Sequence, residues 1–315
     1  MKFVTYKYME RCYRTGLFTE EGNVVDLNYA YEYLLAKKGE PASKLLAGAV
    51  VPADSLAFLE CGERAWKGAK EVLEASLPLG AKNSSGKVMV LARSEVKLGP
   101  PVINPGRIIC LAHNYTDFLE ETGQPKPPVP RIFSKYHNAL CGPDDPIIYP
   151  PMTKELGYEI EVAVIIGKEG KYIPKEKALD YVAGYSIFND VSASDLTGVD
   201  KQVLRGKTFD NFAPCGPYLV TKDEVPNPNN LDVCLWVNDT VLQSSNTSKL
   251  VYNVQELVSF LSEVFTLMPG DIIATGTPGG LAKDRNPTTF MNVGDVCKLE
   301  VEKLGVLVNP VVAEK

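Results

Sequence analysis

The chain has 315 residues, 45% of them hydrophobic and 23% charged, which is typical of a globular protein with a substantial core. Its net charge of -6, without a lysine and arginine cluster, argues against nucleic acid or an anionic membrane surface as a partner. Seven scattered cysteines without a Cys-x-x-Cys pair indicate free thiols in a reducing compartment. With no signal segment and no aliphatic run of membrane-spanning length, the sequence predicts a cytoplasmic protein.

The first 78 residues are predicted to form a small α+β domain. A strand over 3–8 and a strand pair around the turn at 20–23 come first, and two helices follow. The second helix is predicted over 55–77, where apolar positions follow an approximate 3.6-residue period. Residues 79–100 begin with a stretch rich in Gly, Ser and Asn, and are predicted to be a linker and an entry strand.

The main domain is predicted over 101–315. Short β-rich runs are separated there by glycine and proline, and helical periodicity occurs only near 175–181 and 254–265. The expected strands lie at 107–111, 158–166, 185–188, 218–220, 233–238, 271–275 and 296–301. The sequence therefore predicts a mixed α/β, strand-dominated fold.

Two glutamates, Glu159 and Glu161, interrupt an otherwise apolar strand, and Asp190 ends the next apolar run. In a strand, residues two apart point to the same face about 6.5 to 7 Å from each other, so both carboxylates can reach one cation. Oxygen ligands alone favour magnesium or manganese. The alternative is a structural role on a strand face, and the pattern by itself leaves both possibilities open.

Seven segments, in order, resemble the fumarylacetoacetate hydrolase family over roughly residues 80–312. They are RIICLAHNYTD (107–117), FSK (133–135), GYEIE (157–161), NDVSASD (189–195), GKTFD (206–210), CGP (215–217) and PGDIIATGTP (269–278). The segment QSSNT (243–247) is similar to a subgroup with an N-terminal extension that includes acylpyruvase, oxaloacetate decarboxylase and tautomerase relatives. The resemblance implies the family's β-roll catalytic domain and a homodimer.

The resemblance also implies a metal site. Glu159, Glu161 and Asp190 match the family's ligands of a divalent ion, Mg²⁺ or Mn²⁺. The implied substrate is a 2-oxo acid or β-dicarbonyl compound whose oxygens chelate the ion, which then acts as a Lewis acid. Such an ion stabilises the enolate that forms when a bond beside a carbonyl group breaks.

Other site residues are carried over in the same way. Lys207 matches a lysine directed at the bound substrate, although a solvated surface lysine is the alternative. Thr277 and Gly276 match a turn that holds the substrate carboxylate, although an ordinary glycine-rich turn would look the same. Tyr115, in the Asn-Tyr motif, is assigned to substrate binding, and Lys135 is a candidate second cation at the pocket wall.

The chain departs from the family in the groups that move protons. Many members carry a His-x-x-Glu pair after Asn-Tyr; here Glu121 matches the glutamate, but Phe118 stands in place of the histidine. Phenylalanine cannot transfer a proton, and general acid–base catalysis typically contributes ~10²- to 10⁴-fold. Glu121 is a candidate to act alone, with its pKa raised in an apolar closed lid. His113 is the better placed of the two histidines to replace the base, unless it only ends a strand; the other is His137.

A second departure lies beyond Asp190. The family's Ala-Arg-Asp-x-Gln segment reads here with Ser194 and Thr197 in place of the arginine and the glutamine. The loss of a fixed cation and of a bidentate donor suggests a substrate of different charge or shape.

Three functions are consistent with these residues. The leading hypothesis is a metal-dependent hydrolase or lyase that cleaves or decarboxylates an acylpyruvate-like or oxaloacetate-like substrate. The second is a tautomerase or dehydratase, because enolate stabilisation without hydrolytic water suits the absent histidine. The third is a non-catalytic metabolite-binding protein, against which the intact ligands argue, because three buried carboxylates without a cation would be costly.

Overall fold

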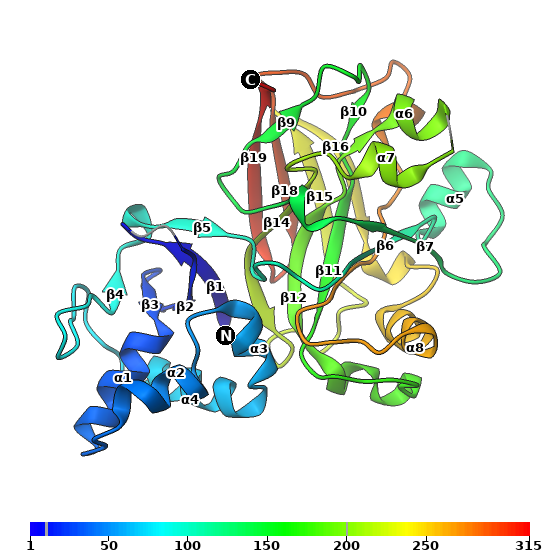
Figure 1. The fold of residues 1–315 in the computed structure, drawn as a ribbon. Helices are drawn as coiled ribbons and strands as arrows, with labels where there is room; N and C mark the ends of the chain where they lie inside the picture. Colours follow the sequence, from blue (N-terminus) through cyan, green and yellow to red (C-terminus); the bar gives the residue numbers. More distant parts are fainter. Residues whose placement is uncertain (10–11, 200) are drawn as a thin grey trace.

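The computed structural model describes residues 1–9, 12–199 and 201–315 (Figure 1). Strands outnumber helices in this part of the chain, so the predicted mixed α/β, strand-dominated class is confirmed. No helix within these residues is long and apolar enough to cross a membrane.

Most of the strands are short, as the glycine and proline punctuation predicts. They are β1 (Lys2–Lys7), β2 (Arg14–Phe18), β3 (Val24–Asp26), β4 (Val90–Leu91), β5 (Lys97–Gly99), β6 (Ile108–Ala112), β7 (Arg131–Lys135), β8 (Leu140–Cys141), β9 (Ile147–Tyr149), β10 (Leu156–Gly157), β11 (Ile160–Ile166), β12 (Val182–Asn189), β13 (Ser192–Ala193), β14 (Ala213–Thr221), β15 (Asp232–Val237), β16 (Thr240–Asn246), β17 (Ile272–Ala274), β18 (Val296–Val301) and β19 (Gly305–Ala313).

The helices cluster at the N-terminus and around the edges of the sheets. The α-helices are α1 (Leu27–Lys37), α2 (Ser43–Val50), α3 (Ser55–Glu60), α4 (Glu63–Glu74), α5 (Thr116–Thr122), α6 (Ser194–Val199), α7 (Val203–Lys207) and α8 (Val254–Val264). Single turns or short stretches of 3-10 helix are η1 (Arg93–Glu95), η2 (His137–Ala139), η3 (Lys175–Tyr181), η4 (Thr247–Lys249) and η5 (Ala282–Asp284).

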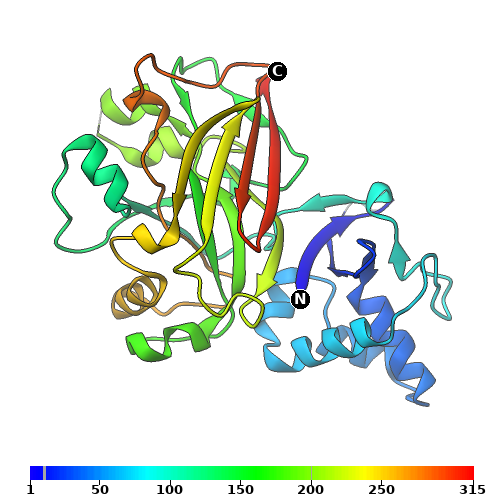
Figure 2. The same cartoon turned by 180° about the vertical axis from the view of Figure 1, so that it is seen from behind.

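A large sheet runs through the molecule in the order β4-β3-β2-β1-β14-β12-β11-β17-β6-β7. Its central strands β11 and β12 are buried at every residue, which explains their almost uninterrupted apolar sequences. A second sheet, β16-β15-β18-β19-β9, packs over this centre, with β15 against β11 and β18 against β12. Figure 2 shows the second sheet in yellow to red on the near side of the molecule. The buried centre holds β11 and β12 rigidly, and these are the strands that carry the acidic residues.

The N-terminal segment is joined to the large sheet. Phe3 of β1 pairs with Leu219 of β14, while α1, α2 and α4 gather beside β1–β3 at one end of the molecule (Figure 1). The single helix predicted over 55–77 is instead two helices, α3 and α4, because Gly62 between them has a φ of 58° that breaks the helical path. The domain boundaries at 78 and 100 and the homodimer stay predictions.

Candidate active site

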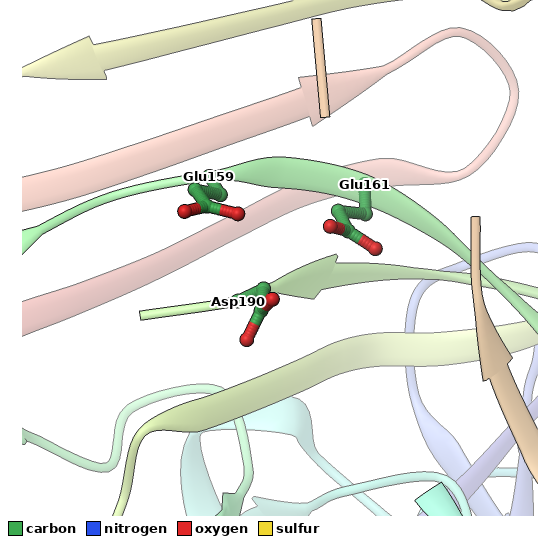
Figure 3. Close-up of side chains that lie close together, drawn as sticks. All are labelled: Glu159, Glu161 and Asp190. Atoms are coloured by element: carbon green, nitrogen blue, oxygen red, sulfur yellow. The ribbon is translucent and has the colours of Figure 1, made fainter. Parts of the chain in front are cut away.

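Three carboxylates converge where two antiparallel strands meet. Glu159 directly precedes β11, Glu161 is its second residue, and Asp190 directly follows β12. Because Ile160 pairs with Asn189, Asp190 lies beside both glutamates. Figure 3 shows the three side chains close together, and one carboxylate oxygen from each lies within 4.8 Å of the others. The structure thus brings together the three residues predicted to bind a metal.

Two lysines face these carboxylates. Lys207, at the end of α7, places Nζ 2.8 Å from Glu159 Oε1 and 2.7 Å from Asp190 Oδ2. Lys135, at the end of β7, forms an ion pair with Asp190 Oδ1 and donates to the Phe212 carbonyl at 2.7 Å. Three carboxylates against two ammonium groups leave one carboxylate without a charged partner.

Glu161 is that carboxylate. Burial first, and then the negative charges of Asp190 and Glu159, raise the pKa of Glu161 well above its ordinary value. Burial also raises the pKa of Glu159, although Lys207 opposes the shift. Burial acts in the same direction on Asp190, but Lys135 and Lys207 outweigh it and lower the pKa of Asp190.

The residues present fit a hard divalent cation. Glu161 Oε2 accepts a hydrogen bond from Gly276 N–H at 2.8 Å, whereas its buried Oε1 has no hydrogen-bond partner among the described residues. A buried polar atom without a partner is rare and costly in a folded protein. A cation between the carboxylates would satisfy this oxygen, and the all-oxygen set suits Mg²⁺ or Mn²⁺.

A cavity of about 160 Å³ opens beside the carboxylates. Its polar wall contains Glu159 and Lys207, together with Thr277. Its apolar wall includes Phe118 and Phe133, and Lys207 Nζ lies 5.4 Å from the centre of the Phe133 ring. A small ligand in this cavity would meet Glu159, one of the three carboxylates, together with one fixed cation and apolar side chains.

The remaining predicted residues are placed in different ways. Thr277 lines the cavity, and Gly276 contributes its N–H to Glu161. Lys135 differs from the expected second cation at the pocket wall, because its side chain is 0% exposed and lies beneath Asp190. Tyr115 is also fully buried, and its hydroxyl has no partner among the described residues.

The segment that the resemblance identifies as a lid forms α5, and its side chains differ from the predicted arrangement. Phe118, on α5, is buried in an apolar cluster with Tyr115, Leu119 and Leu281. Glu121, one turn later, is exposed, and its carboxylate accepts from Gly280 N–H at 2.6 Å. The apolar enclosure expected around Glu121 is therefore absent, because Phe118 occupies the interior of the lid and Glu121 lies on its outer side.

The two histidines lie in different surroundings. His113 lines the cavity, and Arg131 Nη1 donates a hydrogen bond to His113 Nδ1 at 3.1 Å. Burial first, and then the positive charges of Arg131 and Lys283, lower the pKa of His113. His137 is exposed in η2. Only His113 is in a position to touch a ligand in this cavity.

In the sequence, Gln243 was only part of a segment similar to a subgroup of the family. In the structure, its side chain connects two parts of the site. Its buried carbonyl accepts from Ile160 N–H at 3.0 Å, and its amide donates to Thr277 Oγ1 at 2.9 Å. Gln243 therefore ties the start of β11 to the turn that carries Thr277. Because Thr277 Oγ1 accepts this bond, its own hydrogen is free to donate to an anion. The resemblance of the segment QSSNT (243–247) to a subgroup of the family was the only sequence signal.

Replacing Gln243 by methionine should destabilise the protein by about 2 kcal/mol, since buried partners such as Ile160 N–H lose their bonds. The same change should weaken binding of oxalate about tenfold, which a purely structural defect elsewhere would not do. Urea unfolding and titration calorimetry check the two effects. The matched control is Gln255→Met in α8, and equal oxalate affinity in both variants would contradict the assignment.

Known proteins are similar to this chain over most of its length. Residues 107–312 match the family model described as Fumarylacetoacetate (FAA) hydrolase C-terminal. The chain is 43% identical over 293 residues to oxaloacetate tautomerase FAHD2A, mitochondrial, of Bos taurus, covering 92% of this chain and 84% of that protein. It is 42% identical over 264 residues to the Homo sapiens protein of the same name, covering 83% and 81%.

A solved structure is similar over 100% of both chains. It is maleylpyruvate hydrolase from Sphingobium sp. SYK-6 in complex with manganese(II) ion and pyruvate, with a TM-score of 0.73 and 28% sequence identity. The two tautomerases are named for oxaloacetate, and this hydrolase was crystallised with pyruvate. The relatives thus share 2-oxo acids as ligands.

The relatives also correct one prediction. The expected cytoplasmic location is wrong by this comparison, since both tautomerases are named as mitochondrial. Free cysteines indicate a reducing compartment, and they do not distinguish one such compartment from another.

Proposed function

The chain belongs to the fumarylacetoacetate hydrolase family, and we propose that it is a divalent-metal-dependent enzyme that interconverts the keto and enol forms of a 2-oxo acid such as oxaloacetate. The proposal rests on one contrast within the site. The three carboxylates that would hold the metal ion are assembled, whereas Phe118 is buried in an apolar cluster and the Glu121 carboxylate accepts a hydrogen bond from Gly280 N–H. Enolisation needs stabilisation of the enolate oxygen and an acceptor for the carbon-bound proton, which can be solvent, while hydrolysis also needs a water activated as a nucleophile.

The charged groups would stabilise an enolate. Bound by Glu159, Glu161 and Asp190, a Mg²⁺ or Mn²⁺ ion would supply positive charge that lowers the energy of a negatively charged oxygen. Lys207 adds a second positive charge, because Asp190 and Glu159 outweigh the effect of its burial and raise its pKa. It therefore acts as a fixed cation and not as a base.

Other residues of the chain orient the substrate and shape the cavity. The Thr277 hydroxyl, held by Gln243, donates to the carboxylate of the 2-oxo acid. Phe118 and Phe133 line the cavity and make part of its wall apolar. The proton on a carbon flanked by two carbonyl groups is acidic enough for solvent to carry it, so no dedicated base is required.

Cleavage or decarboxylation, the reaction that the sequence put first, is the second candidate. The full-length similarity to maleylpyruvate hydrolase favours it, because that enzyme belongs to the same fold and holds manganese and pyruvate. Hydrolytic cleavage would require a base to replace the absent lid histidine, whereas loss of carbon dioxide from oxaloacetate would leave the enolate directly.

A product assay on oxaloacetate separates the two reactions. With Mg²⁺ or Mn²⁺, the protein should speed the decay of enol absorbance without releasing pyruvate, and EDTA should abolish the effect. Pyruvate formed in step with oxaloacetate loss would favour cleavage over tautomerisation. No acceleration of either process by the metal-loaded protein would overturn the proposed function.

A further inference from the structure

Three basic side chains gather at one part of the cavity. His113 and Lys283 line it, and Arg131 donates to His113 Nδ1 at 3.1 Å. The backbone explains the grouping: Ala112, which precedes His113, pairs with Arg131 across β6 and β7, and η5 carries Lys283 to the same cavity. The tautomerisation described above uses none of the three.

The protein does not neutralise this cluster. Within the described part of the chain neither Arg131 nor Lys283 forms an ion pair, and both side chains reach solvent. Both are close enough to lower the pKa of His113, after the larger effect of burial. Uncompensated cations around one cavity favour a negatively charged ligand group.

The bond from Arg131 also fixes the tautomer of His113. A guanidinium group has donors only, so Nδ1 must be the acceptor and the proton of the neutral ring is on Nε2. His113 can therefore donate a hydrogen bond to an anion. With Nδ1 occupied it is a poor base, which differs from the role that the sequence suggested.

The basic cluster lies outside α6, the helix with Ser194 at the position where the family has an arginine. Ser194 and Thr197 of α6 also line the cavity, in the positions where the resemblance expects an arginine and a glutamine. Positive charge in this chain comes instead from β7 and η5. The cavity thus has a cationic wall, and segments other than α6 supply it.

We propose that Arg131, His113 and Lys283 bind the second carboxylate of a 2-oxo dicarboxylate. Its 2-oxo acid end would lie at Lys207 and the three carboxylates. The inference rests on the proposed function and adds the substrate class to it. A cavity of about 160 Å³ is small beside the ~300–1,000 Å³ of pockets for drug-sized ligands, so it suits a short diacid.

The test compares two substrates that differ only at this end. Oxaloacetate carries the second carboxylate, and 2,4-dioxopentanoate has an acetyl group in its place, so that C3 lies between two carbonyl groups in both. Exchange of the C3 protons for deuterium, followed by proton NMR with Mg²⁺ present, reports enolisation of both. In Lys283→Met, the ratio of kcat/KM for oxaloacetate to that for 2,4-dioxopentanoate should fall about tenfold, mainly through KM. In Lys283→Glu the ratio should fall further, about a hundredfold, since the charge is reversed.

Two further measurements sharpen the result. The matched control is Lys67→Met, an exposed lysine of α4, which should leave the ratio unchanged. Raising the salt concentration should raise the wild-type KM for oxaloacetate more than for 2,4-dioxopentanoate, because exposed charges are screened. An unchanged ratio in both Lys283 variants, with an active wild type, would overturn the subsite. A wild type that exchanges neither acid would instead overturn the proposed function.

Discussion

Replacing Asp190 by asparagine should abolish turnover and lower the free energy of unfolding by about 3 to 5 kcal/mol, since buried Lys135 loses its charged partner and Lys207 keeps only Glu159. Asp190 Oδ2 lies 2.7 Å from Lys207 Nζ, and Oδ1 pairs with Lys135, whose side chain is 0% exposed. Asparagine keeps the shape and one acceptor but loses the charge that both ammonium groups need. Thermal unfolding without metal should show a midpoint lower by roughly 5 to 10 °C.

A matched control isolates the buried charge. Asp239→Asn makes the same change at an exposed position between β15 and β16, and should alter stability by less than about 0.5 kcal/mol. If Asp190→Asn unfolded at the wild-type temperature, the two lysines would not depend on this carboxylate. The assignment of Asp190 as the stabilising partner of both lysines would then be wrong.

Replacing Glu161 by glutamine should have the opposite effect on the metal-free protein. The carbonyl of glutamine can still accept from Gly276 N–H, and the change removes a carboxylate that Asp190 and Glu159 repel. We expect the metal-free variant to be more stable by about 1 to 2 kcal/mol, because like charges close together in a buried site destabilise the fold. Turnover should fall by about 10²- to 10³-fold, because the variant lacks a metal ligand.

The metal response distinguishes Glu161 from an ordinary buried residue. A ligand at a hundred times its dissociation constant stabilises the folded state by about 2.7 kcal/mol, so Mg²⁺ or Mn²⁺ should raise the wild-type unfolding temperature. Glu161→Gln should lose this rise, and Glu263→Gln, an exposed glutamate of α8, should keep it. A metal-dependent rise of wild-type size in Glu161→Gln would rule out ligation by this residue.

Asp190→Asn and Glu161→Gln show how much of the site can be predicted from the sequence. The spacing of Glu159 and Glu161 predicted their shared face, because a strand alternates its side chains whatever surrounds it. The opposite signs expected for Asp190 and Glu161 were not readable, because they depend on Lys135 and Lys207. Those lysines are 55 and 17 residues from Asp190 in the chain, and only the fold brings them to it.

The lid gives the clearest case of a correct residue in an unexpected setting. The sequence identified the substitution at Phe118 and the retained Glu121, since both follow from a motif of fixed spacing. It expected an apolar environment for Glu121, whereas packing put Phe118 inside and left Glu121 bonded to Gly280. One helical turn decides which side chain is enclosed, and that choice depends on the partners of α5 and not on its own sequence.

The sequence by itself determined the family, the strand-dominated class and the acidic triad, because strand alternation and ordered motifs are local properties of the chain. Only the tertiary structure decided which charges compensate one another. It paired Asp190 with two lysines, left Glu161 unpaired, tied Thr277 to Gln243, and set Arg131 and Lys283 around His113. The physical reason is that ion pairs and hydrogen bonds act over a few ångströms in space, and distance along the chain does not predict them.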